Sequence, residues 1–297
     1  MINISLPFSV KVGPGFDTFA LALNSYVKAK ILSVEKNSEE KGIVFETSGK
    51  KCVVTEEFFF LCEKVFKFLK KNYNLPDYKI KIQIICDKNY IPFLNQSDTL
   101  MLLLIKVMDI TYNLNFDDEK ILKLFKRMSG QIECGVASYM GSLGVADRDR
   151  KNFLTLRWPE DWKIKILQVS NKNKNSAYFN NPQQETISDA ISKTAFFTAA
   201  VCSKSSELLF PSIQDKINYL YGSANVPFAD KINIICRTSR IFGISYLKND
   251  SGFIITGKKS ELEDCVERIK ALYERNSIIN NFYSFDCEQK GINIWEE

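Results

Sequence analysis

The sequence predicts an α+β fold built from two domains. Three observations support this prediction. Segments of alternating polarity, typical of strands, dominate the first part of the chain. A long apolar helix follows Thr99, and the last part of the chain has the pattern of a β-hairpin followed by an amphipathic helix. With 297 residues the chain is long enough for two domains, which we expect to be 1–155 and 156–297.

The first half alternates between strand and helix patterns. Period-two alternation predicts strands that begin at Ile2 and that cover 26–35, 42–47 and 78–86. Apolar residues at helical spacing predict helices that begin at Thr55 and that cover 100–112 and 116–128.

The second half is richer in helix. Strands are predicted at 153–158 and 162–169, with helices at 187–201, 205–210, 213–221 and 228–241. A strand–turn–strand unit is expected at 243–257, followed by a helix at 260–275 that begins with a capping box from Ser260 to Glu263. Edge strands at 283–287 and 292–295 complete the prediction.

Composition excludes several kinds of chemistry. The chain has no histidine, so Ser-His catalysis, Cys-His catalysis and histidine metal sites are absent, and acid–base work falls to Asp, Glu, Lys or Tyr. Eight cysteines show no C-x-x-C spacing, which indicates buried thiols in a reducing compartment. The net charge of +5 is spread along the chain, so we expect neither nucleic acid nor a membrane as partner. No signal-peptide pattern is present, and we expect a cytoplasmic protein.

The most distinctive stretch is GPGFDTFALALN at residues 13–24. From the residues alone it is a tight Gly-Pro-Gly turn, with Asp17 placed to cap the following amides or to face a ligand. It closely resembles the first motif of homoserine kinases, N-L-G-P-G-F-D-x-x-G-x-A-L, in the GHMP small-molecule kinase superfamily. One departure is Lys11, which replaces the asparagine of the family.

The resemblance implies a fold, an activity and a site. The fold would pair an N-terminal domain of the ribosomal-protein type with a ferredoxin-like C-terminal domain, with a small-molecule ligand in the cleft between them. The activity would be ATP-dependent phosphorylation of the L-homoserine hydroxyl, a step of threonine biosynthesis. The substrate would lie against Lys11, Gly15 and Asp17, and against Tyr178, which takes the place of a substrate-binding arginine.

The phosphate loop of the family, P-x-x-x-G-L-G-S-S-A, falls on a segment without glycine. Placing Pro92 on the motif proline puts Gln96, Ser97, Asp98 and Thr99 on G-L-G-S, and no glycine occurs between residues 49 and 130. Glycines let backbone amides approach phosphate oxygens, and a carboxylate at this point repels them. From the residues alone, Asp98 is the cap of the following helix.

The remaining motifs keep their position without their chemical groups. Segment 130–143 matches the family's E-G-H-P-D-N-V-A region at Val136 and Ala137, but the magnesium-binding acid falls on Gly130. The residues give no confident catalytic group and no confident metal ligand. A second arginine of the family falls near Gly222, and the third glycine motif falls on 248–252.

We therefore predict a homoserine kinase-like protein whose ATP site is degenerate, weak or inactive. ATP and magnesium are the expected cofactors if the chain is active, and none is expected if it is not. Two alternatives stay open: an inactive binding or regulatory protein that keeps only the pocket around Asp17, and a kinase for another small molecule with a rebuilt nucleotide site. A homodimer is also left open.

Overall fold

The computed structural model describes residues 1–15, 17–36, 39, 42–46, 56–86, 94, 96–129, 131–147, 152–169, 183–247 and 252–297. Backbone contacts divide this part of the chain into two compact units. Unit 1 comprises Met1–Val10, Ala22–Thr155 and Lys290–Glu297, and unit 2 comprises Lys11–Leu21 and Leu156–Gln289. The units therefore differ from the contiguous ranges 1–155 and 156–297 in two segments, because 11–21 packs with the second unit and 290–297 with the first.

The sheet of unit 1 is mixed. Among the described residues it has seven strands: β1 (Ile2–Lys11), β2 (Phe19–Glu35), β3 (Gly42–Glu46), β4 (Lys79–Cys86), β5 (Leu143–Ala146), β6 (Phe153–Leu156) and β11 (Asn293–Glu296). The main order is β11-β1-β2-β4-β3, while β5 pairs with both β2 and β6. Strand β3 runs parallel to β4, and the β2–β4 and β1–β11 pairs are antiparallel.

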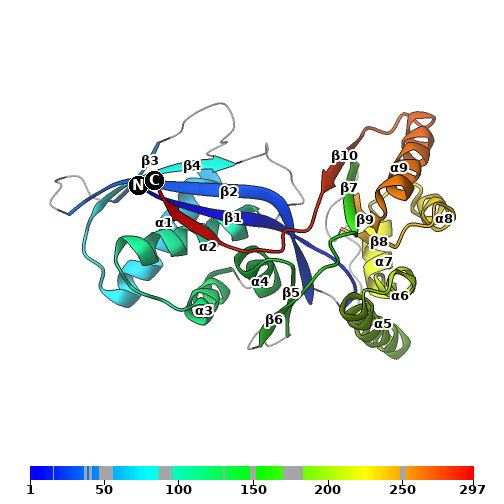
Figure 1. Cartoon of the computed structure of the whole chain (residues 1–297), viewed down its shortest axis with the longest axis horizontal. Helices are drawn as coiled ribbons and strands as arrows, with labels where there is room; N and C mark the ends of the chain where they lie inside the picture. Colours follow the sequence, from blue (N-terminus) through cyan, green and yellow to red (C-terminus); the bar gives the residue numbers. More distant parts are fainter. Residues whose placement is uncertain are drawn as a thin grey trace. The chain divides into compact units, whose positions relative to one another are not determined.

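The helices of unit 1 cover one face of this sheet (Figure 1). They are α1 (Glu56–Tyr73), α2 (Gln96–Thr111), α3 (Asp118–Ser129) and α4 (Ile132–Met140). Helix α3 buries Ile121, Leu122, Leu124 and Phe125, the residues that its apolar spacing places on one side. Helix α2 begins at Gln96 and not at residue 100, so 96–99 form its first turn.

The two ends of the chain lie side by side in unit 1 (Figure 1). Strand β11 pairs with β1 at the edge of the sheet, and the N-terminal ammonium donates to the carbonyl oxygen of Glu297 at 2.7 Å.

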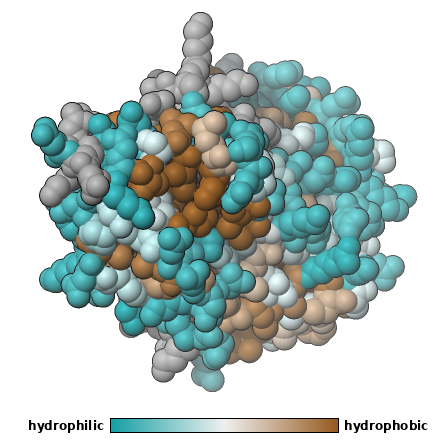
Figure 2. Space-filling view, turned by 60° about the vertical axis from the view of Figure 1, so that its left-hand side comes forward, coloured by the Kyte–Doolittle hydropathy of each residue, from teal (hydrophilic) through white to brown (hydrophobic). Residues whose placement is uncertain are grey.

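The surface of unit 1 exposes large apolar side chains, of which Phe59 and Phe60 on α1 are 51% and 69% exposed. Figure 2 shows hydrophobic side chains gathered on one face of the molecule among hydrophilic ones.

Unit 2 has the β-α-β-β-α-β order of a ferredoxin-like unit. Its described strands are β7 (Lys163–Val169), β8 (Gly243–Tyr246), β9 (Gly252–Gly257) and β10 (Asn280–Phe285), in the order β10-β7-β9-β8, and every neighbouring pair is antiparallel. Its helices are α5 (Gln184–Ser203), α6 (Ser206–Ser212), α7 (Lys216–Ser223), α8 (Ala229–Thr238) and α9 (Lys259–Glu274).

The core of unit 2 lies between its sheet and α8 and α9, which Figure 1 shows on the same side of the strands. Phe253 and Ile255 of β9 contact a cluster that includes Ile232 of α8 and Ile269 of α9, and all four side chains are completely buried. Phe253 and Ile255 are two residues apart on β9, so their side chains lie on the same face of the sheet.

Two local predictions needed correction. Ser260 is not the cap of α9, because the helix begins at Lys259 and its N-cap is Lys258, whose side chain makes no capping hydrogen bond. The strand predicted at 153–158 ends at Leu156. It is β6, which pairs with β5, whereas the strand predicted at 162–169 is β7, which pairs with β9 and β10. The turn expected at 248–251 lies outside the described residues. Within the described chain, none of the helices combines the length and apolarity needed to cross a bilayer.

Candidate functional site

The Gly-Pro-Gly turn lies in unit 2 and packs on α5. Gly13 and Gly15 have φ angles of +81° and +82°, in the left-handed region that favours glycine. A Cβ atom added to Gly13 would lie 2.9 Å from the Phe197 ring, and one added to Gly15 would lie 2.7 Å from the Thr194 hydroxyl. Both glycines are therefore required by backbone conformation and by packing.

The backbone amides of the turn are already hydrogen-bonded within unit 2. The Gly13 N–H donates to the Ser245 hydroxyl at 3.2 Å, and the Gly15 N–H donates to Oδ2 of Asp215 at 2.9 Å. Asp215 is 2% exposed and also caps α7 by accepting the N–H of Asn218. The carboxylate of Asp215 thus joins the turn to the start of α7, a partner that the sequence did not reveal.

Asp17 and Lys11 come together as an ion pair beside the turn. The Lys11 ammonium lies 3.1 Å from Oδ1 of Asp17, and each side chain is about a quarter exposed, at 26% and 24%. Asp17 has a φ of +68°, an uncommon conformation for a residue with a side chain. Lys11, which stands in place of the family's asparagine, therefore offsets the charge of Asp17.

Two polar side chains in the first turn of α2 in unit 1, those of Asp98 and Thr99, are buried. Asp98 is 8% exposed and accepts the hydroxyl of Ser129 at 2.5 Å. Thr99 is completely buried, and its hydroxyl lies 3.2 Å from that of Ser138 on α4. Asp98 at this position suits the positive end of the helix dipole.

The other predicted site residues have simpler outcomes. Ser97 is exposed on the first turn of α2, which begins with Gln96. Glu133, the carboxylate nearest to the expected magnesium site in the sequence, is 1% exposed in the first turn of α4. Tyr178 and Gly130 lie outside the described residues. Among the residues that the structure describes, no group of three or more Cys, Asp or Glu side chains is arranged to hold a metal ion.

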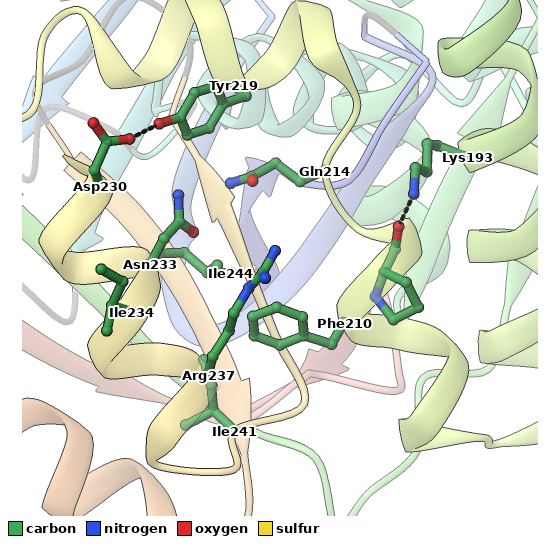
Figure 3. A pocket seen from close by; sticks show the side chains of 11 residues that line it. Lys193, Phe210, Gln214, Tyr219, Asp230, Asn233, Ile234, Arg237, Ile241 and Ile244 are labelled. Carbon is green, nitrogen blue, oxygen red and sulfur yellow. Dashed lines mark hydrogen bonds between the residues drawn. The ribbon is translucent and has the colours of Figure 1, made fainter.

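Unit 2 contains a pocket of about 850 Å³ among its helices (Figure 3). Its lining residues come from α5 to α8 and from β8, with adjoining turns: Lys193, Phe210, Pro211, Gln214, Tyr219, Asp230, Asn233, Ile234, Arg237, Ile241 and Ile244. The Tyr219 hydroxyl donates to Asp230. That hydrogen bond, aided by partial burial, raises the pKa of Tyr219 above its ordinary value.

The sequence analysis did not find this pocket, although α8 carries a signal for it. Asp230, Asn233, Ile234 and Arg237 recur at i, i+3, i+4 and i+7, which places them on one helical face. Ile232 and Cys236, on another face of the helix, are completely buried in the core. A helix with one face in the core and polar residues aligned along another face can use that second face to line a pocket.

The comparisons with known proteins agree on one fold. No protein-family model matches the chain. A homoserine kinase from Caldanaerobacter subterraneus subsp. tengcongensis is 22% identical over 309 residues, covering 99% of this chain and 95% of that protein. The crystal structure of homoserine kinase from Cytophaga hutchinsonii superposes with a TM-score of 0.76 at 14% identity, covering 99% of this chain and 97% of the other.

A further structure, a proposed homoserine kinase from Listeria monocytogenes, superposes with a TM-score of 0.74 at 15% identity over the full length of both chains. The chain has the GHMP-kinase fold, and it is similar to homoserine kinases. In this homoserine kinase-like chain the motif that keeps its glycines is the turn at 13–15, and the segment that has lost them is the start of α2.

Proposed function

We propose that this homoserine kinase-like protein has a degenerate nucleotide site and transfers the γ-phosphoryl group of ATP to homoserine slowly or not at all. The observation that carries the proposal is Asp98. It occupies a glycine position of the family's phosphate loop, lies in the first turn of α2 and is 8% exposed. Helix N-termini bind phosphate because their N–H groups and dipole attract an anion. A carboxylate fixed at the same point opposes a second anion.

The neighbouring residues support the same conclusion. The hydroxyl of Thr99, which stands where the family places a magnesium-binding serine, is buried and lies 3.2 Å from the Ser138 hydroxyl. No glycine occurs between residues 49 and 130 to let the backbone approach a triphosphate. These residues do not fit a phosphate cradle of the family type. Phosphoryl transfer depends on positioning and charge neutralisation, so the loss of both leaves little catalysis.

A small-molecule binding or regulatory role is the alternative that the turn favours. The turn at 13–15 is held by Ser245 and Asp215, which gives Lys11 and Asp17 a rigid support. The ion pair is about a quarter exposed, so a polar ligand from solvent can reach it. Such a role requires no nucleotide.

Calorimetric titration tests the proposal. We expect magnesium-ATP to give no binding heat with this chain under conditions that saturate the Caldanaerobacter homoserine kinase, and we expect no ADP release in the presence of homoserine. A heat of binding for homoserine in the absence of nucleotide supports the binding role. Micromolar binding of magnesium-ATP followed by turnover overturns the degenerate-site proposal, and turnover with a different hydroxyl substrate indicates a rebuilt kinase.

A further inference from the structure

The pocket of unit 2 has a positively charged, hydrogen-bond-donating region. Arg237 is exposed at the edge of the pocket, and its guanidinium lies 5.7 Å from the centre of the Phe210 ring. Nε2 of Gln214 is buried and has no hydrogen-bond partner among the described residues. Figure 3 shows both groups extending toward the middle of the pocket. A buried N–H group without an acceptor is unfavourable until a ligand oxygen meets it.

These two donors match a carboxylate. A guanidinium offers several N–H groups in a plane and binds carboxylates through two parallel hydrogen bonds. Stacking on Phe210 restrains the Arg237 side chain, so less conformational freedom is lost when a ligand binds. Lys193 donates to the carbonyl oxygen of Pro211 at the rim and keeps further N–H groups on the same ammonium.

The same pocket has an acidic region on α8. Asp230 accepts the hydroxyl of Tyr219, and a carboxylate has lone pairs left for a second donor. Asp230 and Arg237 are seven residues apart on α8, so their backbones are separated by about 10 Å along the axis. Helical side chains lean toward the N-terminus, which brings the long Arg237 side chain back toward Asp230. Figure 3 shows Asn233 on the same helix between them.

The wall between the charged groups is apolar. Ile241 and Ile244 are 4% and 2% exposed, and they line the pocket together with Ile234, which is 61% exposed. Small-molecule sites typically combine such apolar walls with a few polar groups that fix the ligand's orientation. The pocket thus combines a positively charged region, an acidic region and an apolar wall.

We propose that this pocket binds a small zwitterion, an amino acid of α or ω type, with its carboxylate on Arg237 and Gln214 and its amino group on Asp230. None of these residues belongs to the turn at 13–17 or to the start of α2, so the site does not depend on the nucleotide proposal. Gln214 directly precedes Asp215, which accepts the Gly15 N–H at 2.9 Å. An occupant that contacts Gln214 therefore lies one residue from the support of the turn.

Titration by calorimetry and by ¹H–¹⁵N NMR tests the proposal. The probes are the common α-amino acids, homoserine, and the series glycine, β-alanine, γ-aminobutyrate and 5-aminovalerate, which varies the distance between the charges. Propionate, propylamine and inorganic phosphate are the single-charge controls. We expect at least one zwitterion to bind and to shift the amide signals of α7 and α8, and we expect each single-charge control to bind much more weakly.

Variants locate the binding site. Arg237→Ala is expected to weaken binding of the zwitterion by about tenfold or more, on the usual scale for hydrogen bonds to charged groups. Asp230→Asn, at the other charged region, keeps the shape and is expected to weaken it by a similar factor. Arg275→Ala is the matched control, because Arg275 is exposed at the end of α9 outside the pocket and should leave affinity unchanged.

Three outcomes would overturn the proposal: no zwitterion binds, phosphate binds as well as any zwitterion, or affinity survives both Arg237→Ala and Asp230→Asn. Circular dichroism of each variant establishes that it is folded before the titration. If Arg237→Ala unfolds, Arg237→Lys keeps the charge and removes the planar donor pair, and it should still weaken binding.

Discussion

The family resemblance predicts substrate or phosphate contacts at two segments, the turn at 13–15 and the first turn of α2. The first segment matches the family motif in its glycines, and the second does not. The turn keeps its glycines, its positive φ angles and its close approach to Phe197 and Thr194. The start of α2 has none of the family's glycines, and its Asp98 and Thr99 side chains are hydrogen-bonded inside unit 1.

The difference teaches that a motif can persist for reasons of packing. At the turn, any side chain meets α5, so glycine is required whether or not a ligand binds. At α2 the residue in the glycine position is Asp98, which lies inside the first turn and is not the N-cap expected from the sequence; its carboxylate accepts the Ser129 hydroxyl. Retention of glycines at the turn is therefore weak evidence for activity, whereas their loss at α2 bears directly on nucleotide binding.

The largest effect is expected from Gly13→Ala. Its Cβ would lie 2.9 Å from the Phe197 ring at a φ of +81°, and left-handed strain together with overpacking should lower the free energy of unfolding by about 2–5 kcal/mol. Chemical denaturation measures the change. Gly42→Ala is the control for strain alone, because its φ is +107° and its Cβ meets nothing within 4 Å. Equal losses in the two variants would contradict the packing argument.

Asp215→Ala tests the link between the turn and α7. It removes the acceptor of the Gly15 N–H and the cap of α7 together, so we expect a loss of about 1–3 kcal/mol in the free energy of unfolding. Asp215→Asn keeps one acceptor oxygen and should lose less. Hydrogen exchange at the Gly15 amide should accelerate in the alanine variant. An unchanged exchange rate would show that Asp215 does not hold the turn.

Asp98→Ala tests the structural role of the residue that replaces glycine at α2. Loss of its bond to Ser129 and of its position at the helix dipole should cost about 1–2 kcal/mol. Ser129→Ala removes the same bond from the other side, so the two losses should not add in the double variant. Full additivity would mean that the two side chains act independently.

The smallest effect is expected from Lys11→Asn, which restores the residue of the family. The Lys11–Asp17 pair is about a quarter exposed, so its removal should change the free energy of unfolding by about 0–1 kcal/mol. Thermal unfolding at low and high salt measures it, and the small difference should shrink further as salt screens the pair. A loss as large as that of Gly13→Ala would contradict the view that packing and not charge fixes the turn.

Much of the fold followed from local pattern. Period-two alternation located strands of the first half, among them β3 and β4, because a half-buried strand must alternate. Helical spacing identified the buried face of α3, because apolar residues three or four positions apart lie on one side of a helix. The strand order of unit 2 agrees with the ferredoxin-like expectation that came with the family resemblance.

Other features had no local signal. The sequence placed residues 11–21 with the first domain, but their packing partners, Phe197, Asp215 and Ser245, are far away in the chain. The capping box of α9 was predicted from Ser260 and Glu263, yet the helix begins one residue before that serine. Hydrogen bonds between residues far apart in the sequence depend on the tertiary packing, so the spacing of residues along the chain does not predict them.

The sequence by itself located many of the strands and helices, but not α4 or β5, and it established that histidine chemistry is absent and that the glycines of a phosphate loop are missing, because these depend only on residue type and spacing. Only the tertiary structure decided that Asp215 supports the turn, that Asp98 is bonded to Ser129, and that Arg237, Gln214 and Asp230 line one pocket. The physical reason is that these side chains meet through the packing of separate elements, which local propensity does not specify.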